Sequence, residues 1–288
     1  MDYSRFRFRA VVDWIELEIH TAKPTNFPKV QRILREIFGL SEDKKPPFAQ
    51  PLNEGAGGAA TVFRFRIYDP KNWHQVTEIL QKLAQTFSFT ELPRVTAIEI
   101  ALDAYSKGEA TSYELAELVA NYYRSMTRPV SNNRRLYRHY KGGVQPIPQQ
   151  FLSLVRHVSE GWQIAIGDKE AEQYQHMYFK TADQGKPLSE NEHRARIEVT
   201  LRGDKLPHQS LEESQVFDFT SVSGYFKFRN LTDELSSLLA TRSQQIGEKK
   251  QHNRRGGGTR LYLKPTEADA VLNRKAYDAL RDLSRRWK

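Results

Sequence analysis

The chain of 288 residues carries 44 lysines and arginines against 35 aspartates and glutamates, a formal net charge of +9, and no cysteine. The missing cysteines exclude disulfides, thiolate zinc sites and thiol nucleophiles, and they favour a reducing compartment. Its length and its hydrophobic fraction of 39% are sufficient for a folded protein with a buried core. Because the N-terminus is charged, we expect no signal peptide. Because no apolar run reaches roughly 18 residues, we expect no membrane span.

The positive charge is concentrated in two zones. Residues 241–288 hold 13 Lys/Arg and five Asp/Glu, and residues 118–159 contain arginines and tyrosines but no acidic residue. Cations attract phosphates and aromatic rings stack on bases, so we predict nucleic-acid binding; a solvated loop beside a tyrosine-rich core edge is the alternative for the second zone. The predicted DNA-binding residues come from these two zones, together with Arg196 of a later strand. They are Arg124, Arg128, Arg134, Arg135, Arg138, Lys141, Arg196, Arg254 and Arg255.

The first 126 residues predict strands and helices in alternation. Alternating apolar and polar residues predict strands at 11–19, 61–68 and 95–103. Apolar residues at helical spacing predict helices at 26–38, 72–87 and 111–126. Strict alternation in the first strand places Asp13 on the face of Ile15 and Leu17, opposite Trp14 and Glu16.

After residue 126 the pattern changes to shorter strands, at 162–167, 173–181, 195–202 and 225–229, with a helix near 232–240. Residues 241–258 have almost no apolar content and indicate a flexible basic linker. A helix from about residue 266 repeats apolar residues at helical spacing, which favours a helix that docks on the core over one that binds a partner.

We therefore predict an α+β fold with a twisted, mostly antiparallel sheet of the palm or ferredoxin-like type. Helices cover one face, and a basic C-terminal linker and helix follow. The predicted division is an α+β domain at 1–240, which could be a duplicated palm-like unit, a linker at 241–258, and a strand and helix segment at 259–288.

Three stretches, 5–9, 63–66 and 226–229, alternate aromatic and basic residues. Because side chains alternate across a strand, each stretch would have an aromatic face and a cationic face. In one sheet they would form rows of positive charge, and ordinary surface cations on edge strands are the alternative.

Motifs for common catalytic sites are missing. There is no P-loop, no HExxH and no His-x-His pair, which excludes P-loop ATP hydrolysis and the usual two-histidine metal sites. Instead, three strands each have one apolar face and one face with ionisable groups. On one of them Glu99 lies between Ala97 and Ala101, which would leave room for an ion or a phosphate. A solvent-exposed sheet face is the alternative interpretation.

The later strands carry a spaced set of residues that resembles the replication initiation factor family, whose members start rolling-circle replication of certain plasmids and filamentous phages. The matching residues are Gly167, Tyr174, Tyr178, Lys180 and Arg196-Ile197-Glu198, preceded by a strand from Ala97-Ile98-Glu99 to Asp103. The resemblance covers roughly residues 10–205. It implies a DNA-nicking enzyme in which a tyrosine attacks DNA while acidic residues hold Mg²⁺ or Mn²⁺, on a twisted sheet related to the palm of nicking enzymes.

Three positions depart from the family pattern. Ala97 and His176 stand where the family often has arginine, and Ala171 replaces the usual serine. These departures could alter DNA contacts or mark a member that has lost nicking activity.

Strand geometry limits the metal ligands that the resemblance implies. Glu99 and Asp103 are four residues apart on one strand, about 13 Å, so they cannot share an ion without a bulge. Glu99 and Glu198 on neighbouring strands can approach to about 5 Å. We predict Glu99 and Glu198 as the main ligands, Asp103 as a secondary ligand, and Asp13 or Glu16 as the third.

Tyr178 is the predicted nucleophile because it occupies the Tyr-x-Lys position of the family, with Lys180 placed to contact phosphate. Tyr174 lies two residues earlier on the same face and is the second candidate. An aromatic residue that merely covers the sheet is the alternative for either tyrosine.

The leading hypothesis is a rolling-circle replication initiator that nicks one DNA strand through a 5′-phosphotyrosine intermediate and leaves a free 3′-OH. The expected partners are single-stranded or hairpin origin DNA and the helicase and polymerase of a bacterial host, in its cytoplasm; a homodimer is compatible with this function. A DNA-binding factor without catalysis on the same fold is the second hypothesis. A metal-dependent nuclease without a covalent intermediate is the third.

Overall fold

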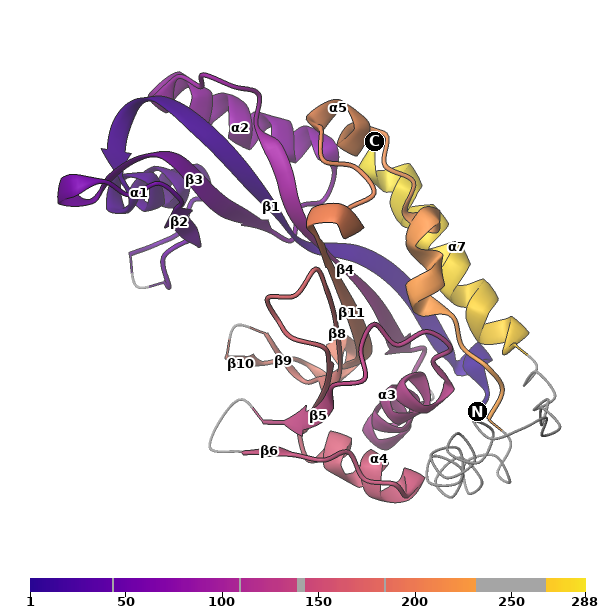
Figure 1. The fold of residues 1–288 in the computed structure, drawn as a ribbon. Helices are drawn as coiled ribbons and strands as arrows, with labels where there is room; N and C mark the ends of the chain where they lie inside the picture. Colours follow the sequence, from indigo (N-terminus) through magenta and orange to yellow (C-terminus); the bar gives the residue numbers. More distant parts are fainter. Residues whose placement is uncertain (43, 109, 139–142, 184, 232–267) are drawn as a thin grey trace, which may run out of the picture.

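The computed structural model describes residues 1–42, 44–108, 110–138, 143–183, 185–231 and 268–288. Its main element is an antiparallel sheet with the strand order β2-β3-β1-β4-β11-β8-β7-β5-β6, and a separate hairpin is formed by β9 and β10. The sheet is strongly twisted, and helices lie along it (Figure 1). The predicted α+β fold with an antiparallel sheet is confirmed.

The three longest strands all lie in the first half of the chain. They are β1 (Phe6–Asn26), β2 (Ala49–Pro51), β3 (Ala59–Tyr68), β4 (Arg94–Ser106), β5 (Arg134–Tyr137), β6 (Val144–Gln145), β7 (Gln163–Ile166), β8 (Gln173–Lys180), β9 (Ala182–Asp183), β10 (Lys186–Pro187) and β11 (Arg194–Arg202). The α-helices are α1 (Phe27–Ile37), α2 (Trp73–Phe87), α3 (Ser112–Ser125), α4 (Phe151–Ser159), α5 (Leu211–Gln215) and α7 (Ala270–Trp287). Short 3-10 helices are η1 (Tyr3–Arg5), η2 (Ala56–Gly58), η3 (Glu190–Glu192), η4 (Gly203–Lys205) and η5 (Phe219–Phe226).

Side chains that cap the first turn fix where three of the helices begin. The side chain of Asn26 accepts a hydrogen bond from the backbone N–H of Lys29 at the start of α1, and that of Asn72 accepts one from the backbone N–H of Gln75 at the start of α2. Thr111 and Glu114 form a reciprocal capping box at the start of α3. Each such cap contributes about 1 kcal/mol.

Strand β1 contains a bulge next to Asp13. Val12 pairs with Ile100 of β4 whereas Trp14 pairs with Glu99, so Asp13 is an extra residue without a partner in the ladder. As a result, buried apolar residues lie at even positions before the bulge and at odd positions after it: Phe6, Ala10 and Val12, then Ile15, Leu17 and Ile19. A second register shift, after Glu16, restores the original pairing offset.

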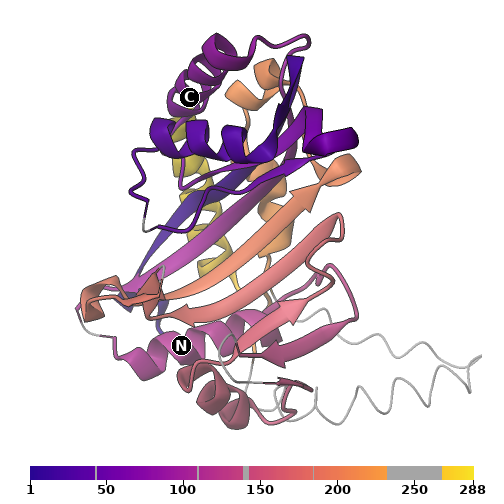
Figure 2. The same cartoon turned by 90° about the vertical axis from the view of Figure 1, so that its left-hand side faces the viewer.

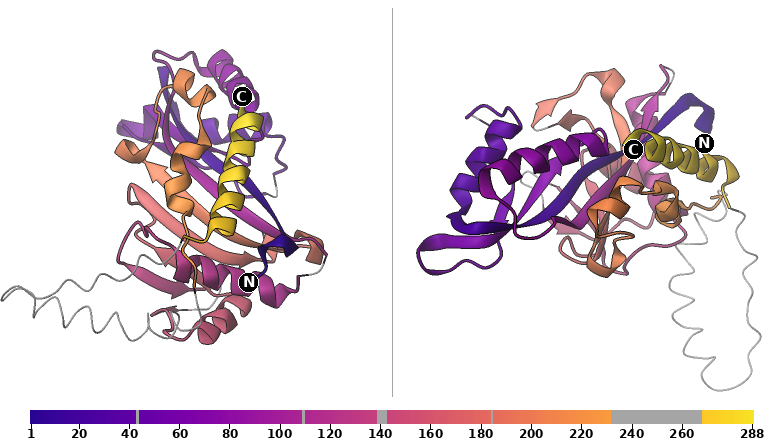
Figure 3. Two further views of the ribbon diagram at one scale, coloured as in Figure 1. Left: turned by 90° about the vertical axis from the view of Figure 1, so that its right-hand side faces the viewer. Right: turned by 90° about the horizontal axis from the view of Figure 1, so that it is seen from above.

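The apolar face of the sheet and the helices form one hydrophobic core. Helices α1 and α2 pack on each other and on β1, α3 and α4 pack on each other and on β8, and α7 packs on β1 and η5. Figure 3 shows α7 and η5 in front of the strands, and Figure 2 shows the strands from the side opposite α7. Trp287, at the end of α7, is buried and contacts Trp73 of α2 with ring centres 6.0 Å apart, so α7 is part of this core.

The prediction of a strand at 225–229 is wrong. Tyr225 and Phe226 end η5, and Phe228 makes only an isolated bridge with Met126. The alternating aromatic residues are instead buried against helices, where the ring of Phe228 stacks on Tyr122 of α3 at 5.3 Å. The sheet therefore contains two of the three predicted rows of alternating basic residues, those of β1 and β3.

Other predictions concern the C-terminal region. The predicted helix near 232–240, the basic linker at 241–258 and the domain boundaries around it lie outside the described residues. Helix α7 begins at Ala270, after Asp269, whose side chain accepts a hydrogen bond from the backbone of Leu272. None of the described helices combines the length and the apolar character that a membrane crossing requires.

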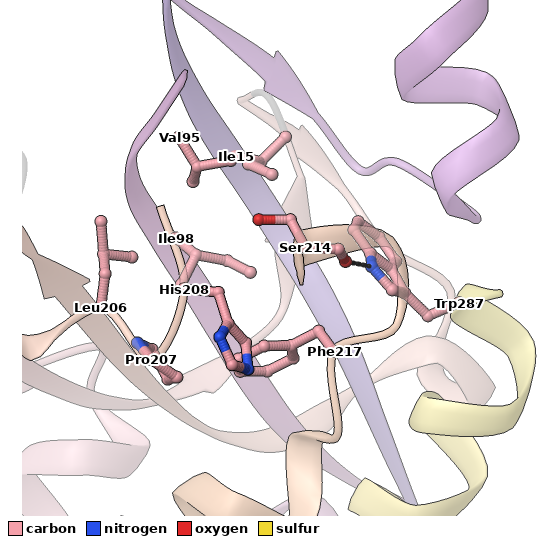
Figure 4. Close-up of a pocket in the computed structure, with 9 residues that line it drawn as sticks. All are labelled: Ile15, Val95, Ile98, Leu206, Pro207, His208, Ser214, Phe217 and Trp287. Atoms are coloured by element: carbon pink, nitrogen blue, oxygen red, sulfur yellow. Dashed lines mark hydrogen bonds between the residues drawn. The ribbon is translucent and has the colours of Figure 1, made fainter. Parts of the chain in front are cut away.

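Between the C-terminal end of α7 and the sheet lies a cavity of about 10 Å³, lined by side chains that include Ile15, Ile98 and Phe217 (Figure 4). The indole nitrogen of Trp287 donates to the carbonyl oxygen of Ser214 beside it, at 3.0 Å. The volume is that of one water molecule, so this cavity is a packing feature and not a substrate site.

Candidate active site

The face of the sheet that points away from the hydrophobic core carries polar side chains in register. Glu99 of β4 pairs with Trp14 of β1 on one side and Thr200 of β11 on the other. One row further along, Glu198 of β11 pairs with His176 of β8. Residues paired directly in an antiparallel ladder point to the same face, so these side chains lie side by side.

Asp13, Glu99 and Glu198 converge on this face, and we call them the carboxylate trio. One carboxylate oxygen from each lies within 4.8 Å of the other two. Glu99 and Glu198 are buried, and the side chain of Asp13 is 31% exposed. These three carboxylates could hold a metal ion.

The position of Asp13 depends on the bulge in β1. Strict alternation would turn Asp13 toward the core with Ile15, which is what the sequence analysis expected. Because the bulge inserts one residue, Asp13 and Trp14 both point to the polar face, and Asp13 reaches Arg196 and Glu198. The signal was present in the sequence as the change of apolar residues from even to odd positions.

The three acids of the trio differ in how readily they ionise. Burial and the neighbouring charge of Glu198 raise the pKa of Glu99 to about 8. Burial and the charge of Glu198 also raise the pKa of Asp13. Burial would raise the pKa of Glu198 as well, but a hydrogen bond and positive charge from His176, together with Arg196, lower it to about 2. Of these two acids, Glu198 is therefore the more readily ionised and Glu99 the weaker.

Arg196 is the cation of this site, and its side chain is only 4% exposed. Its guanidinium donates to both oxygens of Asp103, at 2.6 and 2.8 Å, and to Asp13 at 2.6 Å. Asp103 is therefore held by Arg196 and lies outside the trio, in line with the four-residue spacing from Glu99. Arg196 was expected to contact DNA, but it is buried and turned toward carboxylates.

The two candidate tyrosines occupy different positions. The hydroxyl of Tyr178 donates to Oε1 of Glu198 at 2.7 Å, and burial together with that carboxylate raises the pKa of Tyr178 well above its usual range. Tyr174 points to the same face, but its hydroxyl is hydrogen-bonded to Tyr137. Lys180, at the end of β8, forms an ion pair with Asp183 at 2.7 Å.

His176 connects the trio to the edge of the sheet, a role that the sequence analysis did not assign. Its Nδ1 lies 3.0 Å from Oε2 of Glu198 and donates, because an ionised carboxylate can only accept. Its Nε2 lies 2.6 Å from the hydroxyl of Tyr137 and 2.8 Å from Oε1 of Gln163. The departure from the family pattern at this position was the available signal.

Glu16, the other candidate for the third ligand, belongs to a separate cluster, which we call the arginine–glutamate ladder. Its members are Glu16, Glu18, Arg64, Arg66 and Arg94. Arg66 donates to Glu16 at 2.8 Å, Arg94 donates to Glu18 at 2.9 Å, and Arg64 lies 3.5 Å from each glutamate. Both glutamates are buried and paired with arginines, and Glu16 is not among the three carboxylates that converge.

The predicted DNA-binding arginines of residues 118–159 do not share one environment. Arg128, Arg134 and Arg138 are exposed. Arg124 and Arg135 are partly buried because they donate to backbone carbonyls, Arg135 to that of Gly167 at 2.8 Å. Lys141, Arg254 and Arg255 lie outside the described residues.

Gly167, the first residue of the family-like spacing, is required by the backbone. It has a φ of +89°, and a Cβ atom there would lie 3.2 Å from the carbonyl oxygen of Gln173. The turn that it forms leads from β7 into β8, the strand that carries Tyr174, His176 and Tyr178.

Comparisons with known proteins give a likeness among solved structures. No protein-family model matches the chain, and no curated protein matches it. Among solved structures, the chain is similar to a rolling circle replication initiator protein from Geobacillus stearothermophilus, with 15% identity and a TM-score of 0.37 over 80% of this chain and 91% of that chain. This identity and this TM-score are too low for the likeness to indicate a function.

Proposed function

We propose that this protein nicks one strand of DNA through Tyr178, with a divalent metal ion held by Asp13, Glu99 and Glu198, and that it thereby initiates rolling-circle replication. The observation that carries the proposal is the hydrogen bond of 2.7 Å between the hydroxyl of Tyr178 and Glu198, within a trio of carboxylates. A phenol in contact with one carboxylate of this trio is a nucleophile placed beside a candidate cation site.

The trio fits Mg²⁺ or Mn²⁺. All three side chains offer hard oxygen ligands, which these ions prefer. The raised pKa of Glu99, caused by burial and by Glu198, reflects like charges that a cation would relieve. When bound, such an ion would polarise a phosphate and stabilise the charge that develops on it.

The residues of the chain divide the remaining work. The oxygen of Tyr178 forms a bond to phosphorus and its proton passes to Oε1 of Glu198, while the bond from phosphorus to the 3′ oxygen breaks and that oxygen takes up a proton. The products are a 5′-phosphotyrosine and a free 3′-OH that a host polymerase could extend. Because the pKa of Tyr178 is raised and that of Glu198 is lowered, the proton transfer must accompany bond formation.

Two groups hold the reacting residues. Arg196 binds Asp13 and lies 3.3 Å from Oε1 of Glu198, and His176 holds the other oxygen of Glu198. Glu198 therefore has a fixed orientation toward Tyr178. The exposed residues Arg128, Arg134 and Arg138 are proposed to bind the DNA strand further from the nick.

A covalent adduct tests the proposal. The purified protein would be incubated with Mn²⁺ and a pool of single-stranded oligonucleotides that includes hairpins, and the products separated in SDS. We expect a DNA–protein adduct in the wild type and in Tyr174→Phe, and none in Tyr178→Phe, which removes only the hydroxyl.

Other outcomes would contradict the proposal in distinct ways. An adduct that survives Tyr178→Phe and is lost in Tyr174→Phe would reassign the nucleophile. Cleavage without an adduct that survives both substitutions would indicate a nuclease without a covalent intermediate. Salt-sensitive DNA binding with no cleavage under any metal would favour the non-catalytic DNA-binding factor.

A further inference from the structure

Arg202 differs from the other arginines around it on the polar face. It is the last residue of β11, and its position in the ladder is opposite Ala97 of β4. Its side chain is partly buried, and its Nη1 has no hydrogen-bond partner among the described residues. The described part of the chain also gives it no ion pair within 4.0 Å, although Glu16 and Glu99 are close enough to influence its charge.

The arginines of the ladder provide the contrast. Arg66 and Arg94 each donate to a buried glutamate at less than 3.0 Å. Arg202 lies beside the same cluster but has no glutamate of its own. A partly buried guanidinium without an acidic partner costs free energy, and it is the type of group that a binding anion would satisfy.

Arg202 is held beside the carboxylate trio by Trp14. Its guanidinium carbon lies 5.4 Å from the centre of the Trp14 ring, and Arg66 lies over the same ring at 4.2 Å. Trp14 pairs with Glu99 and is hydrogen-bonded to it. Arg202 is two residues from Thr200, whose hydroxyl donates to Glu99, so its Cα is about 7 Å from that of a direct neighbour of the trio.

We propose that Arg202 binds a phosphate of single-stranded DNA next to the phosphate that is cut. The inference rests on the proposed function and adds to it a second anchoring point on the DNA strand. The guanidinium is planar and matches two phosphate oxygens at once. Stacking on a base is a less suitable role, because the ring of Trp14 is only 6% exposed and lies beneath the arginines.

The experiment compares Arg202→Gln with Arg94→Gln in the full chain. Both substitutions remove one positive charge from the same face, but Arg94 is 60% exposed and paired with Glu18. Binding of a fluorescent single-stranded oligonucleotide would be measured over a range of salt concentrations, in a Tyr178→Phe background so that no covalent adduct forms.

We expect Arg202→Gln to lower the affinity about tenfold and to reduce the slope of log affinity against log salt by about 0.7, the value for one phosphate contact on a single strand. Arg94→Gln should change the slope by less than half as much, and Arg202→Lys should retain most of it. A Mn²⁺-induced rise in melting temperature that equals that of the parent would show that Arg202→Gln is folded with an intact trio.

An unchanged slope in Arg202→Gln, or equal losses in Arg202→Gln and Arg94→Gln, would overturn the inference. The result is independent of nicking: an adduct in the wild type together with an unchanged slope refutes only the role of Arg202. A reduced slope without any adduct supports Arg202 and refutes the proposed reaction.

The location of the contact has a separate test. Once the adduct has identified the nick position, a neutral methylphosphonate would replace each neighbouring phosphate in turn. One position should lower the affinity of the parent about as much as Arg202→Gln does, and it should have no further effect on that variant. Additive losses at every position would overturn the proposed contact.

Discussion

Two groups of buried carboxylates lie a few residues apart on β1 and its neighbours, on the same face of the sheet, in opposite electrostatic surroundings. In the arginine–glutamate ladder, Glu16 and Glu18 are surrounded by three arginines. In the carboxylate trio, Asp13 and Glu198 share one arginine, Arg196, which also binds Asp103, and Glu99 accepts hydrogen bonds from Thr200 and Trp14.

This difference in charge pairing leads us to expect a structural role for the ladder and a functional role for the trio. Buried acids that are matched by arginines need no further partner, and their removal should affect stability. Buried acids that face one another are retained at a cost in stability, and the cation of the proposed function would offset that cost. Each of the following substitutions tests one side of this contrast.

The largest effect is expected from Glu99→Gln in the trio. Adduct formation should fall by roughly 10² to 10³, because the metal loses a charged ligand, and the Mn²⁺-induced rise in melting temperature should disappear. Without metal, the variant should be as stable as the wild type or more stable, because a neutral amide replaces the acid that burial and Glu198 make costly to ionise. Gel analysis of the adduct and thermal unfolding measure both effects; full adduct yield in the variant would refute a catalytic trio.

The cation of the trio should matter most for folding. Arg196→Met leaves Asp103, Asp13 and Glu198 without their shared partner, so we expect the free energy of unfolding to fall by about 3–5 kcal/mol. Urea denaturation measures this loss. Arg202→Gln is the matched control, since Arg202 has no acidic partner among the described residues, and it should unfold at the wild-type urea concentration or above. Equal losses in both variants would remove the distinction between them.

A smaller loss of stability is expected in the ladder. Glu16→Gln leaves Arg66 without its carboxylate and Arg64 with only that of Glu18, which should cost about 2 kcal/mol, less than a fully buried pair because the side chain of Arg64 is 34% exposed. Adduct formation, measured under conditions where the variant is folded, should be unchanged. A strong loss of adduct would mean that Glu16 takes part in the site after all.

The smallest effect is a difference in pH dependence. With its pKa raised to about 8 by burial and by Glu198, Glu99 keeps in the folded state a proton that it loses near pH 4.5 when unfolded. The contribution of this proton to the free energy of unfolding is fully present below about pH 4.5. It is lost as the pH rises through 8, by at most about 1.4 kcal/mol per pH unit. The pKa of Glu18 is lowered, against the effect of burial, by hydrogen bonds from Arg94 and His20, so its contribution is present above pH 4.5 and lost as the pH falls.

Urea unfolding without metal would be measured between pH 5 and 9. The free energy of unfolding of the wild type should decline over this range because of Glu99, and that of Glu99→Gln should not show this decline. Saturating Mn²⁺ should remove the decline, because the ion replaces the proton. Identical pH profiles of wild type and Glu99→Gln would contradict the raised pKa.

Much of the fold could be predicted because the strands are half-buried and the helices amphipathic. The helices at 26–38, 72–87 and 111–126 agree with α1, α2 and α3 to within one residue at each end, since Asn26, Asn72 and Thr111 are recognisable caps. Strands β5 and β6 were not predicted because four and two residues are too few to show a period. The stretch at 225–229 has the period of a strand, but tertiary packing on α3 decided its conformation.

The candidate site was predictable as far as regular alternation holds. Glu99, Glu198 and Tyr178 share a face because β4, β11 and β8 pair there in regular register, and their side chains were expected together. The choice between Asp13 and Glu16 could not be made, because it depends on a bulge and on which arginines of β3 pair with which glutamate. These are properties of the assembled sheet and not of one strand.

The bulge in β1 also bears on how the site and the fold depend on each other. If Asp13 were deleted, Val12 and Trp14 would follow each other in normal alternation, and every side chain that enters the core from β1 would still do so. A single inserted residue is therefore enough to bring a third carboxylate to Glu99 and Glu198, in a strand whose core positions are otherwise unaltered.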